Sequence, residues 1–259
     1  MSISIINPDK FENKPNAVLF DLDNTLYDYA TSHQAGMSAI RDKATQKIGV
    51  ELSQFNESFD KARDEVKNQL GKTASSHSRL LYFQRTLENL KLRSQVLLSL
   101  ELEQTYWGSF LAATELREGV LDFLDQLALA GIPKILVTDL TAQIQFRKLV
   151  YLELDKRFEY VVTSEESGND KPHPSGFELA LSKLVSLCPD APSKDLQIWM
   201  IGDNIVSDIE GAKNSLNAST IAIKSELGDH ANNPAIDMTI ETFKDLEKFL
   251  SSKGWIQTY

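Results

Sequence analysis

The sequence is poor in cysteine, in long apolar runs and in basic residues, and each shortage excludes a class of protein. Cys188 is the only cysteine among 259 residues, which excludes an intramolecular disulfide and a metal cage built from several thiolates. No apolar run approaches the length of a membrane span. The 27 Lys and Arg residues face 37 Asp and Glu residues, giving a formal net charge of −10, so a nucleic-acid partner is not expected.

The rest of the composition is ordinary for a globular protein. Hydrophobic residues make up 42% of the chain and charged residues 25%, and the length allows one large domain or two smaller ones. Residues 1–18 contain no basic segment followed by an apolar run, so no signal peptide is expected. We therefore predict a cytoplasmic protein with no membrane partner.

Short apolar runs alternate with helical patterns over most of the chain. The five runs that predict buried strands are residues 17–20, 134–137, 160–163, 197–201 and 220–223. The segments that predict helices in this part of the chain are residues 120–130, 141–152, 174–187, 207–215 and 241–251. Such alternation favours an α/β fold, a Rossmann-like parallel sheet with right-handed crossovers.

Residues 29–115 interrupt this alternation with nearly continuous helical patterning. Between Leu52 and Leu70 the apolar residues recur every three or four positions, which is typical of an amphipathic helix. Residues 76–90 and 96–110 look similar. An apolar stripe is expected to continue through Leu92, Val96, Leu97 and Leu100. We therefore predict an α/β core of residues 1–28 and 116–259, with an all-helical second domain of residues 29–115 inserted into it.

Two carboxylates follow the first predicted strand. Asp21 and Asp23 are two positions apart on a segment that leaves the strand, so their side chains are expected to point the same way and share one site. Buried together they would repel each other unless a cation or a shared proton were present. Because Mg²⁺ prefers oxygen ligands and keeps waters that a phosphate can replace, the pair favours a magnesium site.

The ends of the later strands carry matching polar residues, as expected where parallel strands meet a ligand. The Thr138 hydroxyl and the first amides of the following helix could hold a phosphate. Lys171 lies just before a helix and offers a compact positive charge. Asp203, with Asp208 five residues later, adds a further metal carboxylate and a supporting group.

Together these four segments resemble the haloacid dehalogenase superfamily. They match its DxDxT motif, a Thr or Ser after the second strand, a Lys, and GDxxxxD, in that order between Asp21 and Asp208. The helical insertion resembles the C1-type cap of subfamily I, and the segments KPHPSGFELAL and GDNIVSDIEGAKNS resemble its phosphatases. At one position the sequence departs from the pattern, because Asp139 stands where relatives often carry Asn.

This resemblance implies a Mg²⁺-dependent phosphatase acting on a small phosphorylated metabolite. Asp21 is then the nucleophile that forms an aspartyl-phosphate, and Asp23 is the general acid and base. Lys171 joins them in the catalytic set. The implied substrate-binding residues are Thr25, Thr138, Asp139 and Lys171. The implied metal ligands are Asp21, Asp23 (through its backbone carbonyl), Asp203 and Asp208.

Each of these residues also has a simpler interpretation when it is taken alone. An Asp-x-Asp pair is often only a turn, Thr138 could be a helix N-cap, and Lys171 could be a solvated surface lysine. The ordered set of four motifs favours the catalytic interpretation. In the cap, His77, Arg79 and Arg85 could read the leaving group, but exposed helix polarity is the favoured interpretation for each of them. The same preference applies to His33 near the cap entrance and to Tyr27 just after the first motif.

Several alternatives stay open. A phosphomutase would use the same acid–base pair, and a metal-independent 2-haloacid dehalogenase the same nucleophile and fold, although Asp23 and Asp203 argue against the dehalogenase. A phosphate-binding regulator without catalysis is disfavoured because every motif residue is present. The substrate is left open between nucleotides, sugar phosphates and similar esters, with a nucleotidase-like activity as the first hypothesis. The oligomeric state is not predicted.

Overall fold

The computed structural model describes residues 3–187, 196–226, 228 and 232–256, and Cys188 lies outside these ranges. The chain divides into two compact units. The core unit comprises Met1–Asp28 and Glu115–Tyr259, and the helical unit comprises Tyr29–Thr114. In the part of the chain that the structure describes, no helix is long and apolar enough to cross a membrane.

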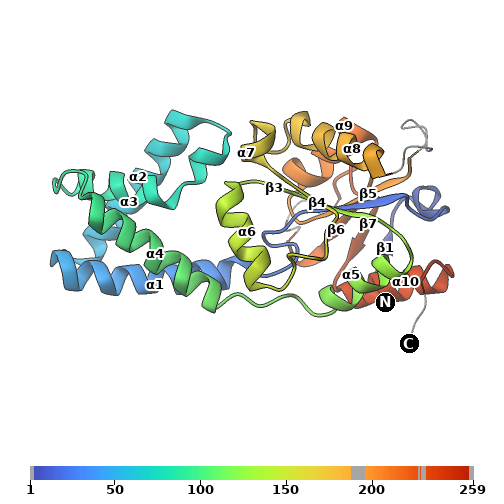
Figure 1. Ribbon diagram of the computed structural model, residues 1–259, viewed down its shortest axis with the longest axis horizontal. Coiled ribbons are helices and arrows are strands. Elements are labelled where there is room, and N and C mark those ends of the chain that lie inside the picture. Colours follow the sequence, from blue (N-terminus) through green and yellow to red (C-terminus); the bar gives the residue numbers. More distant parts are fainter. Residues whose placement is uncertain (1–2, 188–195, 227, 229–231, 257–259) are drawn as a thin grey trace. The chain divides into compact units, whose positions relative to one another are not determined.

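The core unit contains a sheet of seven strands, counted over the described residues, in the order β1-β7-β6-β5-β2-β3-β4 (Figure 1). All neighbouring pairs are parallel except β1 with β7. The strands are β1 (Ser4–Ile5), β2 (Ala17–Phe20), β3 (Lys134–Thr138), β4 (Tyr160–Thr163), β5 (Ile198–Gly202), β6 (Ser219–Ile223) and β7 (Met238–Ile240). From β2 the chain runs to β3 and β4 on one side and then returns to β5 on the other, so the strand order reverses between β2 and β5.

Helices cover both faces of this sheet. On one face α5 and α10 contact each other, and on the other α8 contacts α9, β3 and β4 (Figure 1). The helices of the core unit are α5 (Val120–Leu129), α6 (Ala142–Tyr151), α7 (Ser164–Ser167), α8 (Pro174–Leu187), α9 (Gly211–Leu216) and α10 (Phe243–Ser252). Short helical turns are η1 (Pro8–Phe11), the π-helix η4 (Ile205–Glu210), and η5 (Lys224–Glu226).

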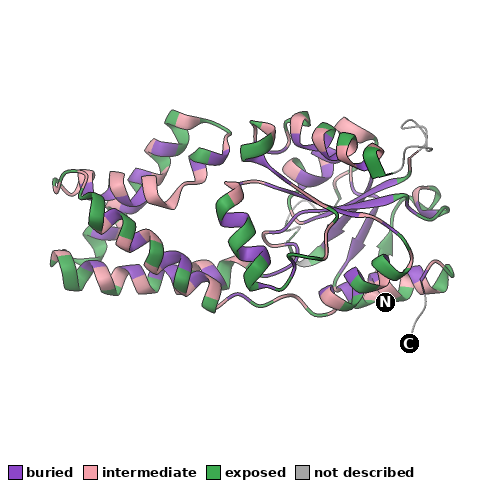
Figure 2. Ribbon diagram, viewed as in Figure 1, coloured by how far each residue is buried: buried purple, intermediate pink, exposed green. Residues whose placement is uncertain are grey.

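The two-sided covering explains why β2 is continuously apolar. All four residues of β2 are buried (Figure 2). Leu19 packs in a cluster with Phe177 of α8, whereas Phe20 packs edge-on against Phe123 of α5 with ring centroids 6.2 Å apart. Because successive side chains of a strand point to opposite faces, both faces need apolar residues here.

The predicted fold class is confirmed, and the five predicted strands agree with the structure to within one residue at each end. The sequence interpretation missed the short strands β1 and β7 and the one-turn helix α7. It also placed one helix at 207–215, where the structure has η4 followed by α9. The two missed strands are two and three residues long, too short for an alternating pattern to show.

The helical unit consists of α1 (Tyr29–Ile48), α2 (Leu52–Leu70), the turn η2 (Ala74–His77), α3 (Arg79–Asn89) and α4 (Val96–Ala112). Helix α1 contacts α4, and α3 contacts both α2 and α4. The core of the helical unit is rich in aromatic side chains. Phe83 lies between Phe59 and Tyr106, with centroid distances of 5.7 and 6.1 Å, and Phe110 continues the cluster.

The predicted apolar stripe at the start of α4 is wrong. Val96, Leu97 and Leu100 are 71%, 72% and 40% exposed. The buried positions of α4 are instead Ser99, Leu102, Tyr106, Trp107 and Phe110. These recur every three or four residues, so the helix turns its apolar first residues outward in order to bury its aromatic ones.

Candidate active site

The predicted site residues meet at the carboxyl ends of the central strands. Asp21 follows β2, Thr138 ends β3, and Asp203 follows β5. The strand order reverses between β2 and β5, and such a switch point is where open α/β sheets bind ligands. A cavity of about 160 Å³ opens there. The residues lining it are Asp21, Asp23, Thr138, Asp139, Lys171, Asp203, Asn204, Ser207 and Asp208.

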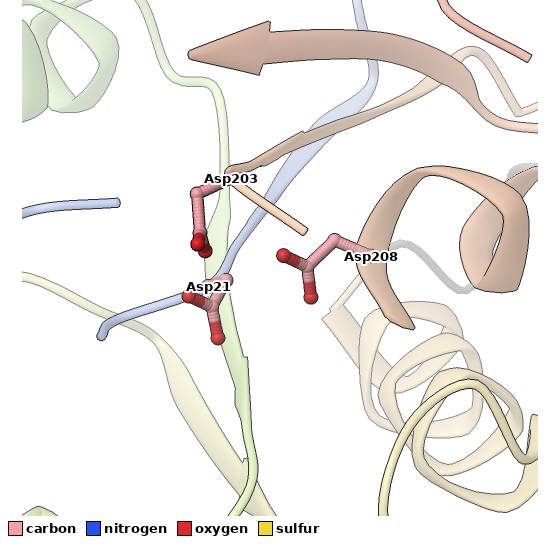
Figure 3. Close-up of side chains that lie close together, drawn as sticks. All are labelled: Asp21, Asp203 and Asp208. Atoms are coloured by element: carbon pink, nitrogen blue, oxygen red, sulfur yellow. The ribbon is translucent and has the colours of Figure 1, made fainter. Parts of the chain in front are cut away.

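Three carboxylates converge in this cavity (Figure 3). Asp21, Asp203 and Asp208 each offer an oxygen within 4.8 Å of the others. Asp21 and Asp208 are only 6% and 1% exposed. The approach of Asp208 depends on Gly202, because a Cβ built there would lie 2.5 Å from both Cβ and Oδ2 of Asp208. Glycine is therefore the residue that lets η4 bring its carboxylate against the end of β5.

Lys171 joins two of these carboxylates. Its Nζ lies 2.6 Å from Oδ1 of Asp21 and 2.7 Å from Oδ1 of Asp208, and it also donates to the Val137 carbonyl at 2.9 Å. The side chain is 4% exposed. Burial lowers the pKa of Lys171, but Asp208, Asp21 and Asp139 outweigh it, so the pKa stays well above its usual value. The ammonium is therefore charged and balances part of the acidic cluster.

Thr25 supports the same cluster from a buried position outside the cavity lining. Its hydroxyl donates to Oδ2 of Asp21 at 3.0 Å and lies 3.3 Å from Oδ1 of Asp203. The residue is fully buried and does not line the cavity. The structure thus brings Thr25 to the carboxylates, where it orients Asp21, rather than to an open surface for a substrate.

Thr138 and Asp139 form the loop after β3. Thr138 accepts a hydrogen bond at 2.6 Å from the Gln145 side chain, and Gln145 also donates to the Asp139 carbonyl at 2.8 Å. The Asp139 carboxylate accepts from the backbone N–H of Lys171 at 2.9 Å. This contact gives a role to the side chain that departs from the family pattern, because it ties the Lys171 loop to the end of β3.

Asp23 has a different set of partners from Asp21. Both oxygens of Asp23 accept from Nζ of Lys148, at 2.7 and 2.8 Å, and its Oδ1 also accepts from the Tyr27 hydroxyl. The Asp23 side chain lies outside the three-carboxylate group. Asp21 and Asp23 therefore bond to different groups, although both line the same cavity. Coordination through the Asp23 backbone carbonyl remains a prediction.

The sequence interpretation missed Lys148 and Gln145. Both lie on α6 in the buried register, beside Ile144 and Leu149. Lys148 is 0% exposed, which is unusual for lysine. The sequence did contain a signal for them, a lysine and a glutamine three positions apart on the apolar face of a predicted helix. Polar side chains buried on such a face need polar partners, so both could have been predicted to contact the site.

The two aspartates of the first motif differ in acidity. Burial raises the pKa of Asp21 to about 7, with Lys171 opposing the shift and Asp208 and Asp23 adding to it. Burial also raises the pKa of Asp23, but Lys148 outweighs it, aided by hydrogen bonds from Tyr27 and Gln145, and holds the pKa below its usual value. The same residue type thus occupies two electrostatic environments within one cavity.

The residues present fit a magnesium ion. Three carboxylates supply the hard oxygen ligands that Mg²⁺ prefers. Burial raises the pKa of Asp203 to about 7, with Asp21 adding to the shift, and it also raises that of Asp208. These shifts reflect desolvation and mutual repulsion, both of which a divalent cation between the carboxylates would relieve.

In the helical unit, the predicted leaving-group readers have unequal surroundings. The Arg79 guanidinium lies over the rings of Tyr82, Tyr106 and Trp107, at 5.2 to 5.7 Å, and donates to the Tyr29 hydroxyl. Arg85 instead forms surface ion pairs, at 3.5 Å with Glu65 and 3.3 Å with Glu88. His33 bonds to the Tyr106 hydroxyl at 2.7 Å, and His77 ends η2 half-buried. Arg79 is therefore part of an aromatic cluster, whereas Arg85 is an ordinary surface residue.

The fold and the cavity define an α/β protein with a cluster of aspartates at the sheet's switch point. A family model described as haloacid dehalogenase-like hydrolase matches residues 15–215. The chain therefore belongs to the haloacid dehalogenase-like hydrolase family.

Individual relatives indicate which reaction class within this family the chain resembles. A ribulose-1,5-bisphosphate 5-phosphatase from Halopiger xanaduensis is 35% identical over 245 residues, which cover 91% of this chain and 99% of that protein. A glyceraldehyde 3-phosphate phosphatase from Methanopyrus kandleri is 30% identical over 197 residues, covering 76% and 78%. The solved structure of the HAD-hydrolase YfnB from Bacillus subtilis, bound to magnesium, aligns with a TM-score of 0.65 at 18% identity, covering 92% of this chain and 100% of that one. The prediction of a phosphatase of this superfamily is confirmed.

Proposed function

We propose that this phosphoric monoester hydrolase acts on a small phosphorylated sugar, with Mg²⁺ as its metal and Asp21 as its nucleophile. The observation that carries the proposal is the position of the Asp21 carboxylate. It lies in the cavity at the end of β2, beside a buried lysine and two further carboxylates. The resemblance to phosphatases over most of the chain supplies the reaction class.

The first half of the reaction transfers the phosphoryl group to the protein. An Asp21 oxygen forms a bond to phosphorus while the bond from phosphorus to the ester oxygen breaks, and the departing alkoxide takes a proton from Asp23. Lys171 and the Thr138 hydroxyl hold the phosphoryl oxygens, where negative charge needs fixed donors. A dianionic ester beside Asp23 raises its pKa, which favours the protonated form that this step needs.

The second half restores the protein. Asp23, now ionised, takes a proton from a water molecule that attacks phosphorus, and the bond between Asp21 and phosphorus breaks to release inorganic phosphate. Lys148 suits this step because it stabilises the ionised carboxylate of Asp23. Mg²⁺, held by Asp21, Asp203 and Asp208, would neutralise the charge that the phosphoryl group brings into the acidic cavity.

The alternatives are weaker. A metal-independent dehalogenase would have no use for the clustered Asp203 and Asp208 or for the buried Asp23–Lys148 pair. A phosphomutase would share every site residue, and only product analysis separates it from a phosphatase. The two similar phosphatases are named for ribulose-1,5-bisphosphate and for glyceraldehyde 3-phosphate, which favours phosphorylated sugars over the nucleotides of the first hypothesis. A cytoplasmic location remains a prediction from the sequence.

Trapping of a phosphorylated protein tests this mechanism. With p-nitrophenyl phosphate, whose leaving group needs little protonation, Asp23→Asn should still be phosphorylated and then hydrolyse slowly. General acid–base assistance is worth roughly 10²–10⁴-fold, so a burst of nitrophenolate should precede a slow steady rate. Asp21→Asn should give neither a burst nor a trapped phosphorylated protein. Its far-UV circular dichroism spectrum should match that of the unmodified protein, which shows that the fold is retained. Label on Thr25 or His173, or substantial turnover by Asp21→Asn, would refute the mechanism.

A further inference from the structure

The acid–base candidate Asp23 is held by a lysine that none of the four motifs contains. Lys148 of α6 places one ammonium group 2.7 Å from Oδ1 and 2.8 Å from Oδ2 of Asp23. Tyr27 donates its hydroxyl proton to Oδ1 as well. Two donors from segments far apart in the sequence therefore fix both the position and the tilt of one carboxylate.

Burial gives this contact its rigidity and limits what Lys148 can do. The Lys148 side chain is 0% exposed, whereas that of Asp23 is 25% exposed and lines the cavity. An ammonium with no exposed surface does not touch a substrate, so any effect of Lys148 on the reaction passes through Asp23. Moving Asp23 away would leave the buried Lys148 ammonium without this carboxylate, which opposes such a movement.

The same face of α6 also holds the loop that ends β3. Gln145 lies one turn before Lys148 and donates to Oγ1 of Thr138 at 2.6 Å and to the Asp139 carbonyl at 2.8 Å. Residues three apart on a helix share one face. Helix α6 therefore fixes the distance between Asp23 and Thr138, the residues assigned to the leaving group and to the phosphoryl oxygens.

We propose that Lys148 is a positioning residue for Asp23, holding its carboxylate in the orientation that both proton transfers need. The inference rests on the proposed function, because it assumes that Asp23 carries those protons. Proton transfer needs heavy atoms about 2.6–3.2 Å apart. A displacement of about 1 Å can cost on the order of 10²-fold in rate. A loosely held carboxylate would therefore lose most of the contribution of Asp23.

The test compares Lys148→Met, Asp23→Asn and the double variant in the full-length protein with Mg²⁺. We expect Lys148→Met to lower kcat/KM for an alkyl phosphate by on the order of 10²-fold and to change it far less for p-nitrophenyl phosphate. In the Asp23→Asn background, Lys148→Met should change kcat/KM for neither ester, because the proton-carrying carboxyl group that Lys148 positions is already absent. Lys183→Met is the matched control, since Lys183 pairs with the surface residue Glu166 at 2.7 Å.

Each outcome decides the matter. Equal losses on both esters, or an undiminished loss in the Asp23→Asn background, would show that Lys148 does not act through Asp23. No loss at all would overturn the inference as well. If Lys148→Met does not fold, Lys148→Arg replaces it under the same criteria, because it keeps a buried cation but changes the head-group geometry. If Asp23→Asn itself leaves the alkyl phosphate reaction intact, the proposed function fails instead.

Discussion

Asp21 and Asp23 are the same residue type two positions apart, and their surroundings shift their acidities in opposite directions. Asp21 is desolvated among other carboxylates, whereas Asp23 faces the ammonium group of Lys148. Sites that divide labour between two carboxylates commonly separate their acidities in this way. The proposed mechanism needs the reverse order, an ionised Asp21 and a protonated Asp23. A divalent cation held by Asp21 would lower its pKa, and a dianionic ester beside Asp23 would raise the pKa of Asp23.

At the same scale, Gly202 should tolerate no side chain. A Cβ at this position would lie 2.5 Å from the Asp208 side chain, so Gly202→Ala must displace Asp208 and with it the pairing of Lys171. We expect a loss of about 1–3 kcal/mol in the free energy of unfolding, typical of overpacking, together with a reduced kcat. Thermal denaturation and steady-state kinetics measure the two effects.

Gly176 provides the matched control for this substitution. A Cβ there would meet Oγ of Ser167 and Cγ1 of Val137 at 3.6 Å, an ordinary contact. Because Gly176 lies within α8, Gly176→Ala should be neutral or stabilise by up to about 1 kcal/mol. Equal behaviour of the two alanine variants would contradict the close approach of Asp208 to β5.

At the scale of elements, the two units use buried polar groups differently. In the core unit, α6 directs Gln145 and Lys148 toward the loops that follow β3 and β2. In the helical unit, α1 and α3 direct His33 and Arg79 into an aromatic cluster around Tyr106. Gln145 and Lys148 therefore support the loops that line the cavity. His33 and Arg79 instead place a titratable ring and a charged guanidinium among aromatic side chains.

His33 should therefore titrate far below ordinary histidines. Burial lowers its pKa to about 4, and the nearby arginines add to the shift while Asp60 opposes it. The arginines are Arg79, Arg63 and Arg41. The unfolded chain binds the proton near pH 6.5 and the folded chain only near pH 4. The helical unit should thus lose stability as pH falls through this window and should keep this contribution in full above it.

Proton NMR of the histidine rings measures this directly. The His33 resonance, assigned by its absence in His33→Gln, should titrate near pH 4. The stability of His33→Gln should depend less on pH between 6.5 and 4 than that of the unmodified protein. A His33 resonance that titrates near pH 6.5 would contradict the burial seen here.

At the scale of the whole molecule, a net charge of −10 is combined with a cavity that gathers three carboxylates. Such a cavity repels a phosphate ester unless positive charge is concentrated within it. Lys171 supplies one such charge, and its Nζ is already shared between Asp21 and Asp208. A bound divalent cation would neutralise the negative charge of the three carboxylates that Lys171 does not balance.

Magnesium should therefore change both the stability and the activity of the protein. At a concentration about 100 times its Kd, Mg²⁺ should stabilise the folded chain by about 2.7 kcal/mol, seen as a rise in Tm. Asp203→Asn should abolish most of that rise, because it removes one of the three ligands. Phosphatase activity should vanish with chelator and return with Mg²⁺ but not with Ca²⁺, whose longer bonds and higher coordination number misplace the phosphate.

Two outcomes would contradict the metal assignment. Full turnover in excess chelator would point to dehalogenase-type chemistry on the same fold. An undiminished Tm rise in Asp203→Asn would place the cation elsewhere. A panel of phosphorylated sugars and nucleotides under the Mg²⁺ conditions then identifies the substrate class.

Much of the site could be predicted because it lies at strand ends. The runs ending at Phe20, Val137 and Ile201 each end in at least three consecutive apolar residues, which marks them as strands covered on both faces. Parallel strands end at one edge, so the polar residues that follow each run had to meet. By contrast, the edge strands β1 and β7 are too short to leave a pattern, and the exposed start of α4 has the composition of a buried stripe.

Local periodicity and strand direction were enough to predict the α/β class, the helical insertion and the meeting of Asp21, Asp203 and Asp208. The partner that each carboxylate takes depends instead on how the helices pack against the sheet. Lys148 lies 125 positions from Asp23, and no spacing rule links a helix lysine to a strand-end aspartate across that separation. The pairing arises because α6 turns its buried face toward the end of β2, where an ammonium deprived of water needs a carboxylate.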